Sequence, residues 1–282
     1  MLKFSVAMSV YKNDNAVFFD RALDSIVVNQ SVIPNEIVLV VDGPVTDEIN
    51  SVIDRYTEKF SIFKIIRLEK NGGTGNALKI AVENASNNLV ARMDSDDVSC
   101  FDRFSQQLKF FENYKDVDIV GGDITEFIGA ENNIVAKRSV PTTNQEIKNY
   151  MKVRCALNHV SVMYKKDKVL QAGNYQDFHY NEDYFLWVRM LLGNCVFGNT
   201  GTVLVNVRVG EDMYRRRGGL KYYRSEKRLQ KFMLKSKIIG FGTYFMNCTK
   251  RFIVQVLMPN KLRGWVFKKF ARKELKDEST SR

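Results

Sequence analysis

Three carboxylates stand within four residues at the end of an apolar run, in LVARMDSDD (residues 89–97). The mostly apolar residues 89–93 predict a buried strand, which Asp94, Asp96 and Asp97 follow directly. Carboxylates crowded in this way repel one another, and a bound Mg²⁺ or Mn²⁺ relieves the repulsion while keeping positions open for substrate phosphates. Because side chains alternate along an extended segment, we expect Asp94 and Asp96 to face the same ligand. A solvated acidic turn is the alternative interpretation.

The elements that must position these carboxylates alternate along the first half of the chain. Apolar, β-branched runs separated by helical patterns are typical of a parallel sheet covered by helices on both faces. Strands are predicted at residues 3–10, 36–41, 63–68 and 89–93, and helices at residues 18–29, 46–60 and 76–84. Ligands bind such sheets beyond the carboxyl ends of the strands, so we expect a crevice there. The polar residues at the four strand ends are Ser9, Tyr11, Asp42, Asn71, Asp94 and Asp96.

The second half of the chain combines helices and strands in a less regular order. Helices are predicted at residues 104–114, 144–152 and 181–191, and strands at residues 117–128, 159–164 and 202–209. Asn181 is the predicted N-cap of the last of these helices. From Glu211 onward the pattern is helical, aromatic and basic. No internal repeat or low-complexity linker separates these parts.

The composition is that of a globular protein of 282 residues, 45% of them hydrophobic and 27% charged. This length allows one large or two modest domains, and the composition excludes disordered and fibrous classes. No apolar run approaches the length needed to span a bilayer, and the N-terminal residues leave no room for a signal peptide. Four scattered cysteines without metal-ligand spacing predict reduced thiols, and hence a cytoplasmic protein.

Positive charge is concentrated towards the C-terminus. The chain has a net charge of +11, yet residues 208–282 carry 21 Lys and Arg against 6 Asp and Glu, a net of +15, whereas residues 1–207 carry a net of −4. Basic and aromatic residues alternate in this part, a mixture that suits the surface of an anionic membrane. Nucleic acid is the competing partner and ranks well below, because no nucleic-acid-binding motif is present.

Further polar residues suit ligand binding or acid–base chemistry. Asp42 stands in VVDGP, where the turn after it directs its carboxylate towards the N–H of a nucleotide base; an ordinary turn aspartate is the alternative. The NGGTG turn (71–75) resembles a phosphate loop, but it lacks the P-loop signature, and a tight strand-to-helix turn explains it equally well. Glu182-Asp183 opens a helix, where a capping role competes with that of a general base.

Four weaker candidates concern an acceptor or a leaving group. His159 lies on a predicted strand, where a lone histidine is more often structural than a ligand. Trp187 is spaced to stack on a sugar ring, with core packing as the default interpretation. Arg216 and Arg217, in RRRGG, either supply cations for a departing diphosphate or form a solvated basic loop.

Four motifs in this order, MSVYKND, VVDGP, MDSDD and NEDYFLWVR, resemble those of glycosyltransferase family 2 over residues 3–209. NHVSVMY and the RRRGG…YYRSE…LQKF segment extend the resemblance to bacterial exopolysaccharide and O-antigen transferases of the amylovoran-synthesis type. The resemblance implies the GT-A fold, an α/β protein with a mostly parallel, Rossmann-like central sheet flanked by helices. Residues 1–100 would bind the nucleotide-sugar and residues 101–209 the acceptor, followed by a basic, aromatic, helical C-terminal region, residues 210–282, with possible membrane association.

The resemblance also implies how the donor is held. Val10 and Tyr11, with Asp42, would hold the nucleotide base. Asn71, at the third strand end, completes this nucleotide-binding set. Asp94 would contact the ribose.

For catalysis, the resemblance implies a metal and a base. Asp96, with Asp94 beside it, would bind the Mn²⁺ or Mg²⁺ that bridges the diphosphate. Asp183, next to Glu182, would be the general base. Arg103 matches a family position near the site.

These roles together imply an inverting, metal-dependent glycosyltransferase. It would move a sugar, most often UDP-linked in this family, to a hydroxyl of a lipid-linked glycan acceptor in the synthesis of bacterial surface polysaccharide, as a peripheral protein on the cytoplasmic face of the inner membrane. Two other functions stay open. A sugar-phosphate nucleotidyltransferase is disfavoured because no Gly-rich, Arg/Lys signature lies near residue 10, and the third possibility is a non-catalytic basic protein that binds membrane or nucleic acid.

Overall fold

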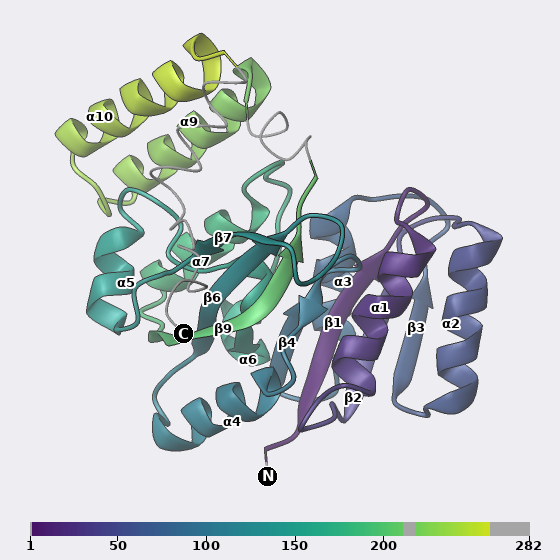
Figure 1. The fold of residues 1–282 in the computed structure, drawn as a ribbon. Coiled ribbons are helices and arrows are strands. Elements are labelled where there is room, and N and C mark those ends of the chain that lie inside the picture. Colours follow the sequence, from purple (N-terminus) through teal and green to yellow (C-terminus); the bar gives the residue numbers. More distant parts are fainter. Residues whose placement is uncertain (1, 211–217, 260–282) are drawn as a thin grey trace, which may run out of the picture.

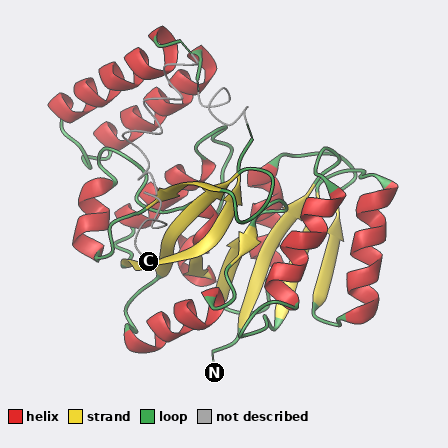
Figure 2. Ribbon diagram, in the orientation of Figure 1, coloured by secondary structure: helices red, strands yellow, loops and turns green. Residues whose placement is uncertain are grey.

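The computed structural model describes residues 2–210 and 218–259 of the chain and has a single mixed sheet at its centre (Figure 1). Within these residues nine strands form the sheet in the order β3-β2-β1-β4-β8-β6-β9-β5, with β7 paired to β6. Helices cover both faces of the sheet (Figure 2). The predicted α/β fold class is therefore confirmed.

Four parallel strands form the N-terminal half of the sheet. β1 (Phe4–Val10) lies between β2 (Glu36–Val41) and β4 (Leu89–Met93), and β3 (Phe63–Arg67) forms the edge. These strands are buried because α1 (Ala16–Val27) and α2 (Asp47–Lys59) pack on one face and α3 (Thr74–Asn84) packs on the other. Val10 pairs with Val41, so the carboxyl ends of β1 and β2 lie side by side. Each of these elements was predicted.

The C-terminal half continues the same sheet in mixed directions. β8 (Met163–Lys165) runs antiparallel to β4 and to β6 (Ile119–Phe127), whereas β9 (Phe197–Arg208) runs parallel to β6 and antiparallel to β5 (Val98–Ser99). β7 (Ile134–Arg138) pairs with the end of β6. The helices of this half are α4 (Arg103–Asn113), α5 (Asn144–Tyr150), α6 (Lys166–Gln171) and α7 (Glu182–Leu192). Because β8 joins β4 to β6, one sheet runs through both halves.

The strand predicted at residues 159–164 is wrong over its first part. His159–Ser161 forms a 3₁₀ turn (η1), and strand pairing begins only with β8. Side chains take the place of strand pairing here, because Asn158 Nδ2 donates to the carbonyl of Gly122 at 2.8 Å and the N–H of Gly122 donates to Ser161 Oγ at 3.1 Å. Because both backbone groups of Gly122 in β6 are already hydrogen-bonded to side chains, residues 159–161 find no strand partner at this position.

Two helices form a hairpin beyond the sheet. α9 (Leu220–Lys235) packs on α7, where the ring of Phe232 meets that of Phe185 edge-on with centroids 5.0 Å apart. α10 (Phe241–Phe252) lies against α9 and continues into a π turn, η2 (Ile253–Leu257). The predicted helical C-terminal region is confirmed for the described residues. None of the helices in the described part of the chain is long and apolar enough to cross a bilayer.

A buried arginine supports β4 from behind. Arg103 is fully buried at the start of α4, where its Nη2 donates to the carbonyl of Arg92 at 2.6 Å and its Nε donates to Gln107 Oε1 at 3.2 Å. Gln107 donates in turn to the carbonyls of Val120 and Ser161, at 3.1 and 2.9 Å. Burial lowers the pKa of Arg103 to about 9, which keeps it charged at neutral pH. Arg103 therefore ties α4, β4, β6 and η1 together, and its charge lies within electrostatic reach of Asp94 and Asp97 at the end of β4.

We expect Arg103→Met to lower the free energy of unfolding by about 2–4 kcal/mol, because buried carbonyl groups lose their donor. Urea denaturation followed by circular dichroism measures this change. Lys109→Met, at an exposed position of the same helix, is the matched control and should stay within about 0.5 kcal/mol of the unsubstituted protein. Equal stability of the two variants would contradict the bracing role.

Candidate active site

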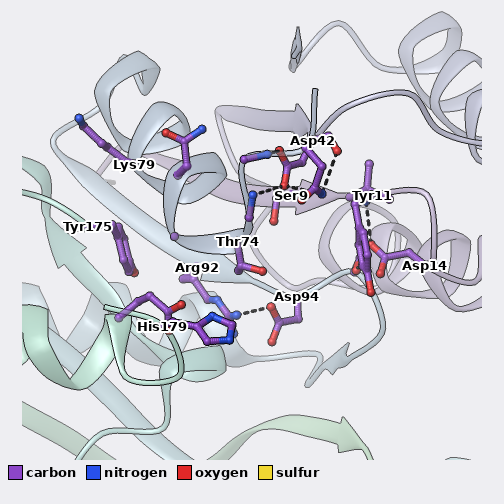
Figure 3. Close-up of a pocket in the computed structure, with 18 of the residues that line it drawn as sticks. Ser9, Tyr11, Asp14, Asp42, Thr74, Lys79, Arg92, Asp94, Tyr175 and His179 are labelled. Atoms are coloured by element: carbon purple, nitrogen blue, oxygen red, sulfur yellow. Dashed lines mark hydrogen bonds and ion pairs between the residues drawn. The ribbon is translucent and has the colours of Figure 1, made fainter. Parts of the chain in front are cut away.

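A cavity of about 1170 Å³ opens beyond the carboxyl ends of β1, β2 and β4, where the sequence predicted a crevice (Figure 3). Small-ligand pockets commonly have volumes of roughly 300–1,000 Å³, so this one has room for a large, elongated ligand. The predicted residues that line it are Ser9, Val10, Tyr11, Asp42, Asn71, Asp94, Asp96 and Glu182. Residues that the sequence did not single out also line it, among them Asp14, Asn76, Lys79, Arg92, Tyr175 and His179.

Asp42 organises the glycine-rich loop on one wall of the cavity. Its Oδ1 accepts the N–H of Gly72 at 2.7 Å, and its Oδ2 accepts the N–H of Gly73 and the side-chain amide of Asn71, both at 2.9 Å. The backbone of Gly43 has φ +85° and lies so near this loop that a Cβ atom would come within 2.7 Å of the Asn71 nitrogen. The carboxylate therefore shapes the NGG turn, a role that sequence reasoning did not assign to it.

Three carboxylates converge at the end of β4. One oxygen each of Asp94, Asp96 and Asp97 lies within 4.8 Å of the others. Asp96 keeps an exposed edge, but partial burial and then the charges of Asp94 and Asp14 raise its pKa to about 6. Asp97 is buried, and its pKa is raised well above the usual range by burial and by the charges of Asp94 and Asp96. This crowding of hard oxygen ligands fits a divalent cation.

Arg92 is the main cationic residue of the cavity that sequence reasoning missed. It stands in β4 with only 4% of its surface exposed, lines the cavity and forms an ion pair with Asp94. Its Nε and Nη1 atoms find no hydrogen-bond partner among the described residues. The available signal was an arginine inside an otherwise apolar strand, because burying such a charge requires a partner or a ligand.

Asp14 connects the end of β1 to the acidic cluster. Its Oδ2 accepts the N–H of Tyr11 at 3.1 Å and the hydroxyl of Ser95 at 2.8 Å. Burial raises its pKa, partly offset by the bond from Ser95. The two loops that follow β1 and β4 are thereby fixed to each other, which holds Tyr11 at the cavity wall.

Glu182 closes the cavity from the side of α7. The N-cap of α7 is Asn181, as predicted, and Glu182 begins the helix. A Cβ atom on Gly75 would lie 3.1 Å from Glu182 Cγ, so the first turns of α3 and α7 meet at this point. Burial raises the pKa of Glu182. The N-terminal ends of two helices, one from each half of the sheet, thus face the cavity together.

Asp183 follows Glu182 in the same turn but does not line the cavity. Burial raises its pKa, while the positive charges of Arg92 and Arg138 act in the opposite direction. Arg92 belongs to the cavity, whereas Arg138 ends β7 and donates to the carbonyl of Cys155 at 2.7 Å. Asp183 therefore lies within electrostatic reach of both the cavity and the β7 region.

Two of the weaker candidates lie behind the cavity wall. Trp187 is fully buried, with its ring edge-on to His159 at 6.0 Å, so core packing is its observed environment. His159 Nε2 lies 2.8 Å from the hydroxyl of Tyr175, which does line the cavity. Burial keeps the pKa of His159 well below its ordinary value, so the ring is neutral. The other histidine, His179, reaches the cavity instead.

The remaining candidates, Arg216 and Arg217, lie outside the described residues. The candidate donor, metal and acid–base residues that the structure does bring together are those of the cavity, and Asp183 is adjacent in sequence to Glu182 of its lining. Arg103 does not line the cavity, although its charge lies within electrostatic reach of Asp94 and Asp97.

Comparison with known proteins supports the resemblance suggested by the sequence. A family model described as Glycosyl transferase family 2 matches residues 5–172. The chain is 36% identical over 273 residues to a UDP-Gal:alpha-D-GlcNAc-diphosphoundecaprenol beta-1,3-galactosyltransferase of Escherichia coli, covering 97% of this chain and 98% of that protein. It is also 36% identical over 270 residues to an amylovoran biosynthesis glycosyltransferase of Erwinia amylovora, covering 94% and 98%.

Solved structures share the fold at low sequence identity. S. aureus TarS 1–349 in complex with UDP-GlcNAc gives a TM-score of 0.64 at 17% identity, covering 89% of this chain and 73% of that one. A mannosyltransferase from Pyrobaculum calidifontis, in complex with GDP-Man and Mn²⁺, gives 0.61 at 15% identity, covering 93% and 71%. The chain spans 46% of the longer TarS structure. This likeness confirms the GT-A architecture.

We expect Asp42→Ala to weaken the binding of UDP about tenfold or more, because the loop at residues 71–73 loses three hydrogen bonds to a charged acceptor. Isothermal titration calorimetry with UDP measures the loss. Glu69→Ala, an exposed acidic position near the same loop, is the matched control for the change in charge. An unchanged dissociation constant for Asp42→Ala would show that the loop does not depend on this carboxylate.

Proposed function

Because the chain belongs to glycosyltransferase family 2 and is a glycosyltransferase, we propose that it moves a sugar from a UDP-linked donor, with inversion, to a hydroxyl of a lipid-linked glycan. Family membership decides among the three functions that the sequence left open, against the nucleotidyltransferase and the non-catalytic protein. The observation that carries the proposal is the cavity, which holds Asp94 and Asp96 between the loop of Asp42 and Glu182. The name of the E. coli relative, with its UDP-Gal donor and diphosphoundecaprenol acceptor, supports both substrate classes.

We assign the nucleotide to the end of the cavity formed by β1 and β2. Val10 and Tyr11 follow β1, and Asn71 stands in the loop that Asp42 holds. Backbone groups and a short amide are available here for the edge of a base, and the tyrosine ring offers an apolar surface. Asp94, at the end of β4, is the proposed contact for the ribose.

The acidic cluster fits a divalent cation, because burial and the neighbouring carboxylate charges raise the pKa values of Asp96 and Asp97 and a cation would relieve this. We assign Asp96 and Asp94 as the residues that would hold Mn²⁺ or Mg²⁺. When bound, such an ion supplies positive charge that stabilises the leaving diphosphate. Asp97 accepts the N–H of Arg208 at 2.9 Å and so fixes the loop that carries the other two.

The chain's own cations also belong on the leaving-group side. Arg92 pairs with Asp94 and retains two guanidinium nitrogens without a partner among the described residues. Its charge offsets that of the carboxylates near the position proposed for the diphosphate. Arg216 and Arg217 remain our proposed further cations for the same group.

We propose Asp183 as the general base that takes the proton from the acceptor hydroxyl. Its carboxylate is within electrostatic reach of Arg92, which lines the cavity, and of Arg138, which ends β7. Glu182, which lines the donor cavity, would contact the donor sugar. The base is carried by α7 and the acidic cluster by the end of β4, so two separate elements serve the nucleophile and the leaving group. In a single displacement with inversion the hydroxyl attacks the anomeric carbon from the side opposite the departing diphosphate, and two separate elements can serve these two sides.

A lipid-linked acceptor is held in a membrane, so the proposed acceptor also implies where the enzyme acts. We propose that it acts as a peripheral protein on the cytoplasmic face of the inner membrane, in the synthesis of an O-antigen or exopolysaccharide. The printed names of its relatives, one acting on a diphosphoundecaprenol and one in amylovoran biosynthesis, support this assignment. The net charge of +15 on residues 208–282 supports contact with anionic lipids.

With Mn²⁺ present, we expect release of UDP from at least one of UDP-galactose, UDP-glucose and UDP-GlcNAc, and we expect a chelator to stop it. Asp96→Asn should lower this rate by about 10²–10³-fold and weaken the binding of Mn²⁺ measured by electron paramagnetic resonance, because one charged ligand is lost. Asp102→Asn, an exposed position just beyond the cluster, should leave both unchanged. Release of UDP that is indifferent to the chelator would overturn the metal assignment.

Asp183→Asn should lower kcat by about 10²–10⁴-fold, because the general base is lost, whereas Glu182→Gln should cost less. A base works in its deprotonated form, so the rate is full above its pKa and falls as the pH drops through it. The raised pKa of Asp183 moves this fall to a higher pH than for an ordinary aspartate. Measuring kcat against pH tests the assignment, and a larger loss in Glu182→Gln would transfer the role to Glu182.

A further inference from the structure

The outward side of the C-terminal hairpin exposes an unusually apolar helix surface. Along α10 and η2, large apolar residues recur at spacings of four and seven, which brings them to one side of the helix. Phe241 is 70% exposed and Phe245 is 64% exposed. The opposite side of α10, with Asn247 and Cys248, is buried. We call the following six exposed residues the outer face of α10: Phe241, Phe245, Met246, Phe252, Ile253 and Leu257.

Positive charge predominates in the part of the hairpin that carries this face. Residues 227–259 contain seven Lys and Arg and no Asp or Glu. Two of the seven are engaged within the protein, because Arg251 pairs with Glu226 at 2.7 Å and Arg228 lies over the ring of Phe178 at 4.4 Å. The other five are exposed lysines: Lys227, Lys231, Lys235, Lys237 and Lys250.

We propose that the outer face of α10 docks on the surface of an anionic lipid bilayer, an inference that rests on the proposed lipid-linked acceptor. Apolar residues on one side of a helix, bordered by lysines, are the pattern of a helix that lies in the plane of the membrane interface. The 17 residues 241–257 would extend about 25 Å along that plane. A second copy of this chain fits less well, because it would bring an equally positive surface against the lysines.

The hairpin also connects this face to the cavity. Figure 1 shows α9 and α10 at the end of the molecule towards which β1 and β9 run, the end where the cavity opens. Ser225 of α9 donates to the carbonyl of His179 at 2.5 Å and accepts from the side chain of Asn181 at 3.0 Å. The segment that leads into Glu182 is therefore held by the same hairpin. Docking through α10 would bring this side of the cavity close to the lipid surface that carries the acceptor.

Cosedimentation with lipid vesicles tests the docking surface directly. We expect the full-length protein to bind vesicles rich in phosphatidylglycerol and to bind pure phosphatidylcholine vesicles much less. The double variant Phe245→Glu with Ile253→Glu should bind the anionic vesicles about tenfold less or weaker still, because two apolar contacts are replaced by charges that anionic lipid repels. The matched control, Val28→Glu with Ile33→Glu, introduces the same charges at exposed apolar positions before β2 and should bind like the unsubstituted protein.

A second variant gives a signal that does not depend on loss of binding. Phe245→Trp should show a blue-shifted emission on anionic vesicles and quenching by brominated lipid, because the ring enters the interface. Trp187 is fully buried and serves as an internal reference that lipid does not reach. Trp265, the other tryptophan of the chain, is replaced by Phe in both proteins that are compared, so that the change reports on position 245. An emission that stays unchanged on vesicles while the protein sediments with them would overturn the proposal.

Enzyme assays separate failure of the docking surface from failure of the proposed function. The double variant should transfer sugar to a GlcNAc-diphosphate on a short, water-soluble alkyl chain as the unsubstituted protein does, and should lose transfer to the undecaprenyl form in vesicles. If neither protein transfers sugar but the variant loses vesicle binding, the acceptor is wrong and the docking surface stands. Vesicle binding that survives both substitutions overturns the docking surface. So does a dimer that dissociates in the double variant, because a second copy would then be the occupant.

Discussion

Negative charge gathered at the carboxyl end of β4 is the constraint on which the rest of the site depends. Asp94, Asp96 and Asp97 lie within 4.8 Å of one another, and their repulsion and partial burial raise the pKa values of the last two. The fold opposes this charge with two buried arginines, Arg92 in ion pair with Asp94 and Arg103 behind the same strand. Each charge is costly to bury alone, and each lowers the cost of the other. Not every hydrogen-bond donor of these arginines is used. Arg92 keeps two guanidinium nitrogens without a partner among the described residues, which leaves them available to a ligand.

The mixed sheet decides what faces this charge. β8 runs antiparallel beside β4 and joins it to β6, which carries the second half of the chain across the same sheet. As a result the first turn of α7 meets the first turn of α3, where Glu182 lies against Gly75. The donor side of the cavity comes from one half and the carboxylates of α7 from the other. The hairpin of α9 and α10 holds α7 from outside, through Ser225 and the aromatic pair of Phe232 and Phe185. The proposed catalytic carboxylates of α7 and the proposed membrane surface of α10 are therefore connected through α9.

The sequence by itself determined the elements of the N-terminal half and the location of the site. The strand predicted at residues 36–41 is observed with these bounds, because a buried parallel strand is a continuous apolar run that needs no tertiary information to recognise. Polar residues after β1, β2 and β4 were predicted to meet, and Tyr11, Asp42 and Asp94 do line one cavity. They meet because parallel strands end at the same edge of a sheet, so position along the chain fixes position in space.

Only the tertiary structure decided which polar side chains reach that cavity. Arg103 was singled out from the sequence and Arg92 was not, yet Arg92 lines the cavity, whereas Arg103 is buried and does not line it. Of the two histidines, His179 lines the cavity, whereas the predicted His159 supports Tyr175 from behind. The helix beginning with Glu182 was predicted, but its meeting with α3 was not. Burial and hydrogen-bond partners depend on segments that are distant in the chain. The local sequence therefore does not show which segment packs against a given residue.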